Sequence, residues 1–173
     1  MSAALRWGVL PLFGAIAFLQ MGCSDVPNYP LCAYQKISPE GWYQEQAVQI
    51  ELDSVVQTAV YELSLLLRVE RTFPLQKLWI SVQAEDSSRV KQLPTDTVLC
   101  TITNAQGKPL GDGLTVFQYK YVVRTDTFRQ GQTPRYQLRH LMQNTPLVGI
   151  RDVGIMVSKA QNPSRSKLQK KNW

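Results

Sequence analysis

Cys23 is the residue whose position most directly predicts chemistry. It follows an uncharged apolar run from Trp7 to Leu19, and the one charged residue before that run is Arg6. A basic residue, a short apolar segment and a small residue before the cut are typical of a secretory signal peptide. The run is shorter than the roughly 20 apolar residues that span a bilayer. We therefore expect cleavage before Cys23, attachment to Cys23 of a lipid with chains such as palmitate, and a mature chain anchored to a membrane.

The sequence before the cut departs at one position from the commonest lipoprotein signal. Gln20 lies three residues before the cysteine, where leucine is usual, and Leu19 lies one step earlier. Ordinary secretion with an unmodified Cys23 is therefore the alternative. On the lipoprotein interpretation, the chain divides into a signal peptide with its helix (residues 1–22), a lipidated N-terminus and tether (residues 23–35), a folded domain (residues 36–158) and a tail (residues 159–173).

The rest of the chain lacks a sequence pattern for catalysis. His140 is the only histidine, so a zinc site of several histidines is excluded. No Gly-x-Ser-x-Gly segment marks a nucleophilic serine. Glu51 and Asp53 share one face of an expected strand, as a glycosidase pair does, but solvated strand edges explain them equally well. Cys32 and Cys100 are expected as free thiols. We expect a protein that is not an enzyme and holds no cofactor or metal, with a carboxylate hydrolase as the alternative.

Aromatic side chains offer a different kind of site. Trp42, Tyr43 and Trp79 are a candidate contact surface, since large exposed aromatic groups mark surfaces that bind other molecules. Trp79 is out of phase with its apolar neighbours Leu78 and Ile80, which places it on the solvent side of its strand. Both faces of a central strand can be covered, however, so core packing of Trp79 is an equal alternative.

The net charge of +6 is confined to the ends of the chain. Residues 23–158 carry 13 basic and 13 acidic residues, so the expected domain is neutral. The tail carries no acidic residue and five basic ones: Lys159, Arg165, Lys167, Lys170 and Lys171. It has no apolar period and is expected to be disordered, either resting on anionic lipid or an acidic partner or simply solvated. Export and a neutral domain argue against nucleic acid as a partner.

Strands are the elements that must position these residues. Apolar and polar residues alternate in seven stretches, the period of half-buried strands. These are residues 47–52, 59–69, 78–85, 96–103, 114–125, 135–143 and 150–157. Residues 135–143 could instead begin a helix. Seven or eight strands separated by turn residues predict an all-β fold, an antiparallel two-sheet sandwich that is jelly-roll-like.

Several segments resemble the gliding-motility lipoprotein GldH family. They are the lipoprotein-type N-terminus ending at Cys23, the segment Lys36-Ile-Ser-Pro-Glu-Gly-Trp42, the glycine-rich turn around Gly111-Asp-Gly113, and the run Leu147-Val-Gly-Ile-Arg-Asp-Val-Gly-Ile155. The resemblance covers most of residues 23–158. The chain departs from the family pattern at Val148, where proline is common, and in its basic tail.

The C-terminal motif has a physical interpretation of its own. Gly149 permits a tight turn, Asp152 can accept hydrogen bonds from loop amides, and Gly154 lets a neighbouring chain or ring approach the strand.

The family resemblance implies a non-enzymatic, membrane-anchored β-sandwich that serves the gliding machinery and its associated protein-secretion system. We expect it to contact other envelope proteins at the outer membrane, facing the periplasm. The alternative is a surface lipoprotein that binds carbohydrate through Trp42, Tyr43 and Trp79.

Overall fold

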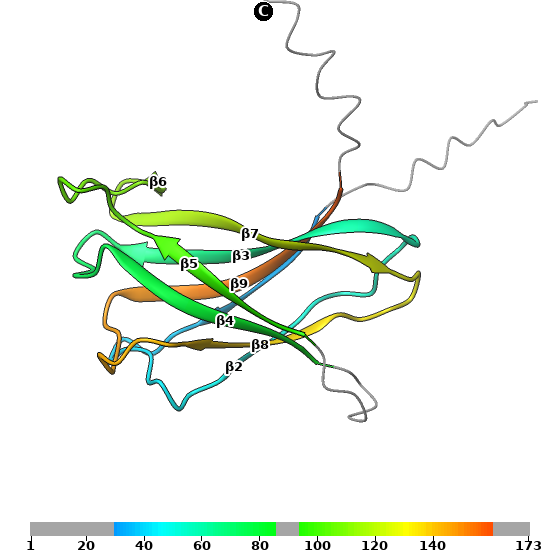
Figure 1. The fold of residues 1–173 in the computed structure, drawn as a ribbon, viewed down its shortest axis with the longest axis horizontal. Helices are drawn as coiled ribbons and strands as arrows, with labels where there is room; N and C mark the ends of the chain where they lie inside the picture. The colour runs from blue at the N-terminus through cyan, green and yellow to red at the C-terminus, as the bar shows by residue number, and fades with distance from the viewer. Residues whose placement is uncertain (1–29, 86–93, 161–173) are drawn as a thin grey trace, which may run out of the picture.

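Two antiparallel β-sheets pack face to face in the computed structural model, which describes residues 30–85 and 94–160 (Figure 1). The five-stranded sheet has the order β1-β9-β3-β7-β6, and the four-stranded sheet has the order β2-β8-β4-β5. The strands are β1 (Leu31–Lys36), β2 (Val48–Glu51), β3 (Ala59–Glu70), β4 (Lys77–Glu85), β5 (Thr95–Thr101), β6 (Asp112–Gly113), β7 (Val116–Phe128), β8 (Arg135–His140) and β9 (Ile150–Lys159). The all-β prediction with two antiparallel sheets is confirmed. If the two-residue β6 is set aside, each sheet has four strands in the order of a jelly roll.

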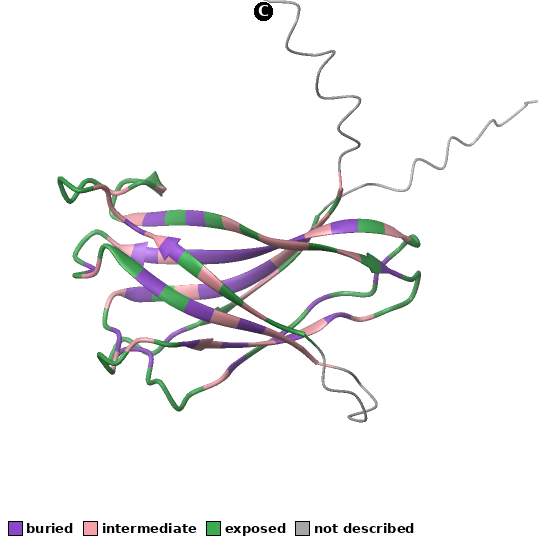
Figure 2. Ribbon diagram, viewed as in Figure 1, coloured by how far each residue is buried: buried purple, intermediate pink, exposed green. Residues whose placement is uncertain are grey.

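The core consists of the inward faces of the two sheets. Along β4, buried and exposed residues alternate, as Figure 2 shows. This is the period-two pattern that the sequence predicts, because successive side chains of a strand point to opposite faces. The central strands contribute the largest share of fully or nearly fully buried side chains: Leu63, Leu65, Leu67 and Val69 of β3, Leu78, Ile80 and Val82 of β4, and Val153, Ile155 and Val157 of β9.

The sandwich begins earlier in the chain than the sequence predicts. Residues 31–35, expected in the tether, belong to β1, which pairs with β9 from Leu31 opposite Val157 to Lys36 opposite Asp152. β1 is an edge strand whose side chains are all half-buried or exposed, so its apolar alternation is weak. The prolines before it also favour an extended linker. The domain boundary predicted at residue 36 is therefore five residues too late.

Two further boundaries differ from the prediction. β8 ends at His140 rather than at residue 143, and its residues form a strand rather than the start of a helix. β9 extends to Lys159, the first residue of the predicted tail. The signal peptide with its helix, Cys23 and residues 161–173 lie outside the described residues. Within the described residues, no helix is long and apolar enough to cross a membrane.

The outer face of the five-stranded sheet is shaped by Gly154. This glycine lies in β9 between Tyr34 of β1 and Leu66 of β3. A Cβ atom at this position would lie 2.5 Å from the carbonyl oxygen of Ala33 and 2.7 Å from Cδ1 of Tyr34. The space that a side chain would occupy is therefore taken by the neighbouring strand and by the Tyr34 ring.

The other two residues of the C-terminal motif also have defined surroundings. Gly149 adopts φ +97°, a left-handed conformation that permits the turn before β9, and its carbonyl accepts a hydrogen bond from the Glu70 amide at 2.8 Å. Asp152 lies 3.8 Å from Nη1 of Arg68, an ion pair across β9 and β3, and accepts no loop amide among the described residues. The Arg68 guanidinium carbon lies 4.1 Å from the centroid of the Tyr34 ring, so Asp152, Arg68 and Tyr34 link three strands on this face.

Replacing Gly154 with valine is expected to lower the free energy of unfolding by about 1–3 kcal/mol. The new side chain has to displace the Ala33 carbonyl or the Tyr34 ring. Valine has a higher strand propensity than glycine, which by itself would raise the stability of the strand. A loss of stability in this variant would therefore come from the steric clash. Urea denaturation of the mature, lipid-free chain measures the change.

Ser158→Val is the matched control. Ser158 lies on the same outer face of β9, opposite Glu62 of β3. Its replacement is expected to change the free energy of unfolding by less than about 0.5 kcal/mol. Equal losses in the two variants would contradict the role assigned to Gly154.

Candidate contact surface

The three aromatic residues predicted to form one contact surface do not share a surface. Trp42 is 0% exposed. Its backbone pairs with Leu147 through hydrogen bonds of 3.0 and 2.8 Å, and its indole Nε1 donates to the carbonyl of Gln46 at 2.9 Å. Trp42 therefore belongs to the core, and its assignment to the contact surface is wrong. Burial of Trp42 was not predictable from local periodicity, because Trp42 lies outside the alternating stretches, in an isolated bridge to Leu147.

His140 lies against Trp42 and is also 0% exposed. The two rings meet edge to face, with centroids 5.2 Å apart. The His140 Nε2 lies 3.0 Å from the Trp42 carbonyl oxygen, and the Met142 amide donates to Nδ1 at 3.4 Å. These contacts assign the neutral tautomer with the proton on Nε2. Burial lowers the pKa of His140, and the hydrogen bond to the Trp42 carbonyl opposes that shift.

Trp79 does lie on an outer face, where it is 44% exposed. Leu99 of β5 lies directly opposite and is 39% exposed. On the other side, the Leu141 amide, just beyond β8, donates to the Trp79 carbonyl at 2.9 Å, and Leu141 is 46% exposed. Side chains that are opposite one another on adjacent strands lie within contact range. Leu141, Trp79 and Leu99 therefore form an apolar row across the four-stranded sheet, which we name the Trp79 row.

Polar residues border the Trp79 row. The next residues outward along the same face are Arg139, Ser81 and Thr97, which are paired in register across the same strands. The Ser81 hydroxyl donates to the Arg139 carbonyl at 3.3 Å, and the Arg139 guanidinium donates to the Glu45 carbonyl at 2.8 Å. An apolar centre with a polar border is the usual composition of a protein interface.

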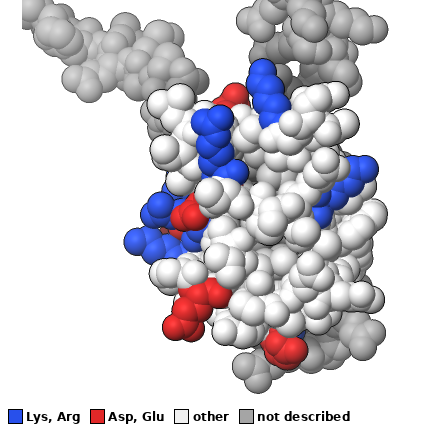
Figure 3. Space-filling model, turned by 90° about the vertical axis from the view of Figure 1, so that its left-hand side faces the viewer, with Lys and Arg blue, Asp and Glu red and all other residues white. Residues whose placement is uncertain are grey.

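Other exposed apolar residues lie outside this row. Tyr43, the third aromatic residue of the predicted surface, is 44% exposed in the segment between β1 and β2. Leu110, Leu114 and Val148 are more than half exposed and lie in connecting segments. Figure 3 faces the end of the sandwich at which β6 lies, and most of the atoms on view there are uncharged. The sequence placed Tyr43 on a contact surface and left exposure of Trp79 as one of two equal alternatives. It did not predict the leucines beside Trp79, because the partner strands were not known.

Charged side chains gather in a cleft at the opposite end of the sandwich. The cleft has a volume of about 440 Å³ and is lined by residues that include Arg124, Asp126, Arg135 and Tyr136. Arg124 pairs with Asp96 and, at 3.4 Å, with Asp126. Burial raises the pKa of the Tyr136 hydroxyl. Both arginines therefore lie beside carboxylates, Arg124 beside Asp96 and Asp126 and Arg135 beside Glu51.

The other candidate reactive groups are dispersed. The Glu51 carboxylate, part of the predicted pair with Asp53, lies 2.9 Å from Nη2 of Arg135. Cys32 is exposed and Cys100 is buried, and both are free thiols as predicted. Burial raises the pKa of Cys100 to about 12, so its thiolate is not populated at neutral pH. Among the residues that the structure describes, no three His, Cys, Asp or Glu side chains are placed to hold a metal ion.

The described residues thus define an all-β sandwich of two antiparallel sheets with an exposed apolar row on one outer face. Residues 31–157, which include nearly the whole of both sheets, match the GldH lipoprotein family. The chain belongs to this family, as the sequence motifs predict. Its members are lipoproteins linked to gliding motility, which indicates a membrane-associated location in the cell envelope.

Two other comparisons add little. No match was found among curated proteins. A solved structure of Eiger TNF from S. frugiperda overlaps 78% of this chain and 98% of its own, with 10% sequence identity and a TM-score of 0.33. That similarity is too low to carry an argument about fold or function.

His140 is expected to make the stability of the domain depend on pH. A folded-state pKa below the unfolded value means that the unfolded chain binds the proton more readily. The free energy of unfolding should therefore be constant above about pH 6.5 and decrease as the pH falls below that value. His140→Gln keeps a donor for the Trp42 carbonyl and does not titrate, so it should show a shallower decrease. Urea unfolding of both chains from about pH 7 to about pH 5 measures this difference, and equal slopes would contradict the assignment.

Proposed function

We propose that this chain is a non-enzymatic lipoprotein, anchored by a lipid on Cys23 at the outer membrane and facing the periplasm. There it acts by contact with other proteins of the gliding machinery and its associated secretion system. The family match supports the lipoprotein class and the link to gliding. The signal pattern that ends at Cys23 supports the site of the lipid.

The Trp79 row is the observation that most supports a contact role. A tryptophan flanked by two leucines is a large apolar surface on a sheet face that is otherwise polar. Binding energy at protein interfaces is concentrated in a few such residues, tryptophan foremost, surrounded by a border that excludes water. We therefore assign the row to an apolar surface of a partner protein in the envelope.

Carbohydrate binding is the second candidate, because Trp79 and Tyr43 are both exposed aromatic residues. A sugar ring that stacks on tryptophan also needs polar groups at its edge to hydrogen-bond the hydroxyl groups. The immediate cross-strand neighbours of Trp79 are Leu99 and Leu141, whose side chains offer none, and the bordering Ser81 and Arg139 side chains already donate to backbone carbonyls. The surroundings of Trp79 therefore favour a protein partner.

A role without catalysis agrees with the placement of the reactive groups. His140 is fully buried with both ring nitrogens engaged by the backbone. Three carboxylates form ion pairs with arginines, namely those of Glu51, Asp96 and Asp126. These ion pairs are structural contacts.

Lipidation is tested by metabolic labelling with a palmitate analogue. We expect the wild-type chain to be labelled and to sediment with membranes, and Cys23→Ala to lose the label completely. Cys32→Ala is the matched control, because Cys32 is the exposed cysteine of the sandwich, and it should keep the label. Label that survives Cys23→Ala would overturn the proposed anchor.

The contact role is tested by co-purification from cross-linked membranes. Trp79→Ala is expected to weaken the association with motility and secretion proteins by about 2 kcal/mol or more, roughly 30-fold. Val122→Ala, on the exposed face of the other sheet, should leave the association unchanged. A glycan-array signal that disappears in Trp79→Ala, without loss of protein partners, would instead support carbohydrate binding. Both variants should keep the thermal stability of the wild type.

A further inference from the structure

We propose that the cleft at the end of the sandwich opposite β6 binds a basic side chain, lysine or arginine, of a partner protein. Arg124 is among the residues that line this cleft, and we name it the Arg124 cleft. No residue of the Trp79 row lines it, so the inference goes beyond the proposed function and does not rest on it. Three observations carry it: the apolar walls of the cleft, the carboxylates around it, and the buried hydroxyl group of Tyr136.

Apolar residues form part of the walls of the Arg124 cleft. They are Ala84 near the end of β4, Phe128 at the end of β7, and Pro94 and Pro134 in connecting segments. The volume of about 440 Å³ is within the range of clefts that hold small ligands. Lysine and arginine pack their methylene stems along apolar surface and keep the charged head among polar groups. A long basic side chain therefore matches a cleft that combines apolar walls with carboxylates.

Arg135 of the cleft lies between two carboxylate side chains. In the register of the four-stranded sheet, Arg135 is opposite Glu51 of β2 and opposite Glu85 of β4. Residues that are directly opposite on antiparallel strands lie within contact range. Nη2 of Arg135 lies 2.9 Å from the Glu51 carboxylate, and Glu85 lines the cleft itself.

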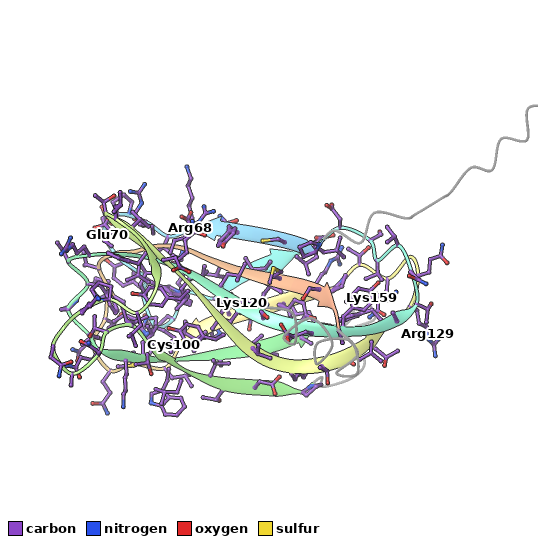
Figure 4. All side chains as sticks on the ribbon, turned by 90° about the horizontal axis from the view of Figure 1, so that it is seen from above. Arg68, Glu70, Cys100, Lys120, Arg129 and Lys159 are labelled. Atoms are coloured by element: carbon purple, nitrogen blue, oxygen red, sulfur yellow. The ribbon has the colours of Figure 1, made fainter. Side chains whose placement is uncertain are left out.

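Arg124 is also placed between two carboxylates. It pairs with Asp96 of β5 and, at 3.4 Å, with Asp126 of β7. Figure 4 shows Arg129 and Lys159 toward this end of the sandwich, but neither residue lines the cleft. The described groups that line the cleft or pair with its lining are therefore four carboxylates and two guanidinium groups. This excess of negative charge attracts a cation and repels an anion.

The hydroxyl group of Tyr136 is a buried polar group within the cleft. Tyr136 lines the cleft and is 2% exposed. Burial raises the pKa of its hydroxyl, on which the charges of Arg124, Asp126 and Asp96 also act. In the part of the chain that the structure describes, no hydrogen bond engages this hydroxyl. Buried polar groups are normally paired, and a phenolic oxygen can accept a hydrogen bond from an ammonium or guanidinium group.

A metal ion does not fit the same groups. Within residues 30–85 and 94–160, no three His, Cys, Asp or Glu side chains are placed to hold one. The carboxylates of the Arg124 cleft are separated by guanidinium groups, which a metal ion would have to displace. A basic side chain needs only one or two carboxylate oxygens and a neutral acceptor, because its charge-assisted hydrogen bonds are individually strong.

The test uses the mature chain, residues 23–173, with Cys23→Ser so that no lipid is attached. The probes are Nα-acetyl-lysine amide and Nα-acetyl-arginine amide, with the norleucine and citrulline derivatives as uncharged counterparts. Amide NMR spectra of the isotope-labelled chain follow each titration. We expect saturable shifts at Gly131, Gln132 and Thr133, which line the cleft, and binding of the uncharged probes that is weaker by at least about tenfold.

Three substitutions remove the proposed contacts without a large change of shape. Glu85→Gln and Asp126→Asn are each expected to weaken binding of the basic probes by about tenfold, because each removes a charged acceptor. Tyr136→Phe removes the hydroxyl alone and is expected to weaken binding by at least about fivefold. The thermal stability of each variant shows whether the domain is folded.

The matched control removes acidic groups from the other end of the sandwich. Glu40 and Asp112 are both exposed, Asp112 in β6 and Glu40 in the segment between β1 and β2. Glu40→Gln with Asp112→Asn should leave binding within about twofold of the wild type, because salt confines the attraction to roughly 10 Å.

Several results would overturn the proposal. They are the absence of shifts with both basic probes, equal binding of charged and uncharged probes, or binding that survives Glu85→Gln and Asp126→Asn together. Shifts of the cleft residues with vesicles that contain phosphatidylethanolamine, without a response to the basic probes, would assign the cleft to a lipid head group instead. None of these results bears on the anchor at Cys23 or on the Trp79 row, which are tested separately.

Discussion

The position of β9 between β1 and β3 is the constraint on which the rest of the structure depends. β9 is the second strand of the five-stranded sheet and pairs antiparallel with both neighbours, over Asp152–Val157 with β1 and, with one irregularity at Arg68/Val69, along its length with β3. It is able to do so because Gly154 has no side chain, which lets the Ala33 carbonyl and the Tyr34 ring close over the strand. The Arg68 guanidinium then lies over the Tyr34 ring and pairs with Asp152. The absence of a side chain at Gly154 thus makes room for the contacts that link three strands on the outer face. The pairing of β9 with β1 also joins the first and last strands of the sandwich.

The pairing of the first and last strands has a consequence for function. Any attachment through the N-terminus acts at the end of the sandwich where β9 also ends. The Trp79 row lies on the four-stranded sheet, whose outer face is on the other side of the core from β1 and β9. The fold thus places the end of the sandwich at which β1 begins apart from the outer face that offers apolar contact. A lipid anchor confines such a surface to the membrane and raises its effective concentration for partners held there.

The sequence predicted those parts of the fold that local periodicity controls. The alternation of apolar residues located the long strands β3, β4, β7 and β9, because half-buried strands repeat every two residues. The alternation did not predict β1, because the half-buried and exposed side chains of this strand alternate little. β1 is defined instead by its pairing with β9, more than a hundred residues later in the chain. Family motifs identified the GldH lipoprotein family because they lie in turns and close approaches that only a few residue types allow.

The candidate site was predicted only in part, for the same physical reason. The phase of Trp79 within β4 left exposure and core packing as equal alternatives, and the structure places it outward. Burial of Trp42 and the arrival of Leu99 and Leu141 beside Trp79 depend on contacts between segments far apart in the chain. The Asp152 side chain was assigned to loop amides on local grounds, whereas it pairs with an arginine of β3. Local rules predict which way a side chain points, and tertiary pairing decides what it meets.

Site-specific photo-cross-linking in living cells tests the contact role most directly. A photoreactive phenylalanine analogue is placed at Leu99, in the Trp79 row, and in a second strain at Val122, which is exposed on β7 of the other sheet. The account predicts a covalent adduct with a gliding or secretion protein at Leu99 and none at Val122. No adduct at Leu99, or the same adduct at both positions, would contradict the assignment of this face to protein contact.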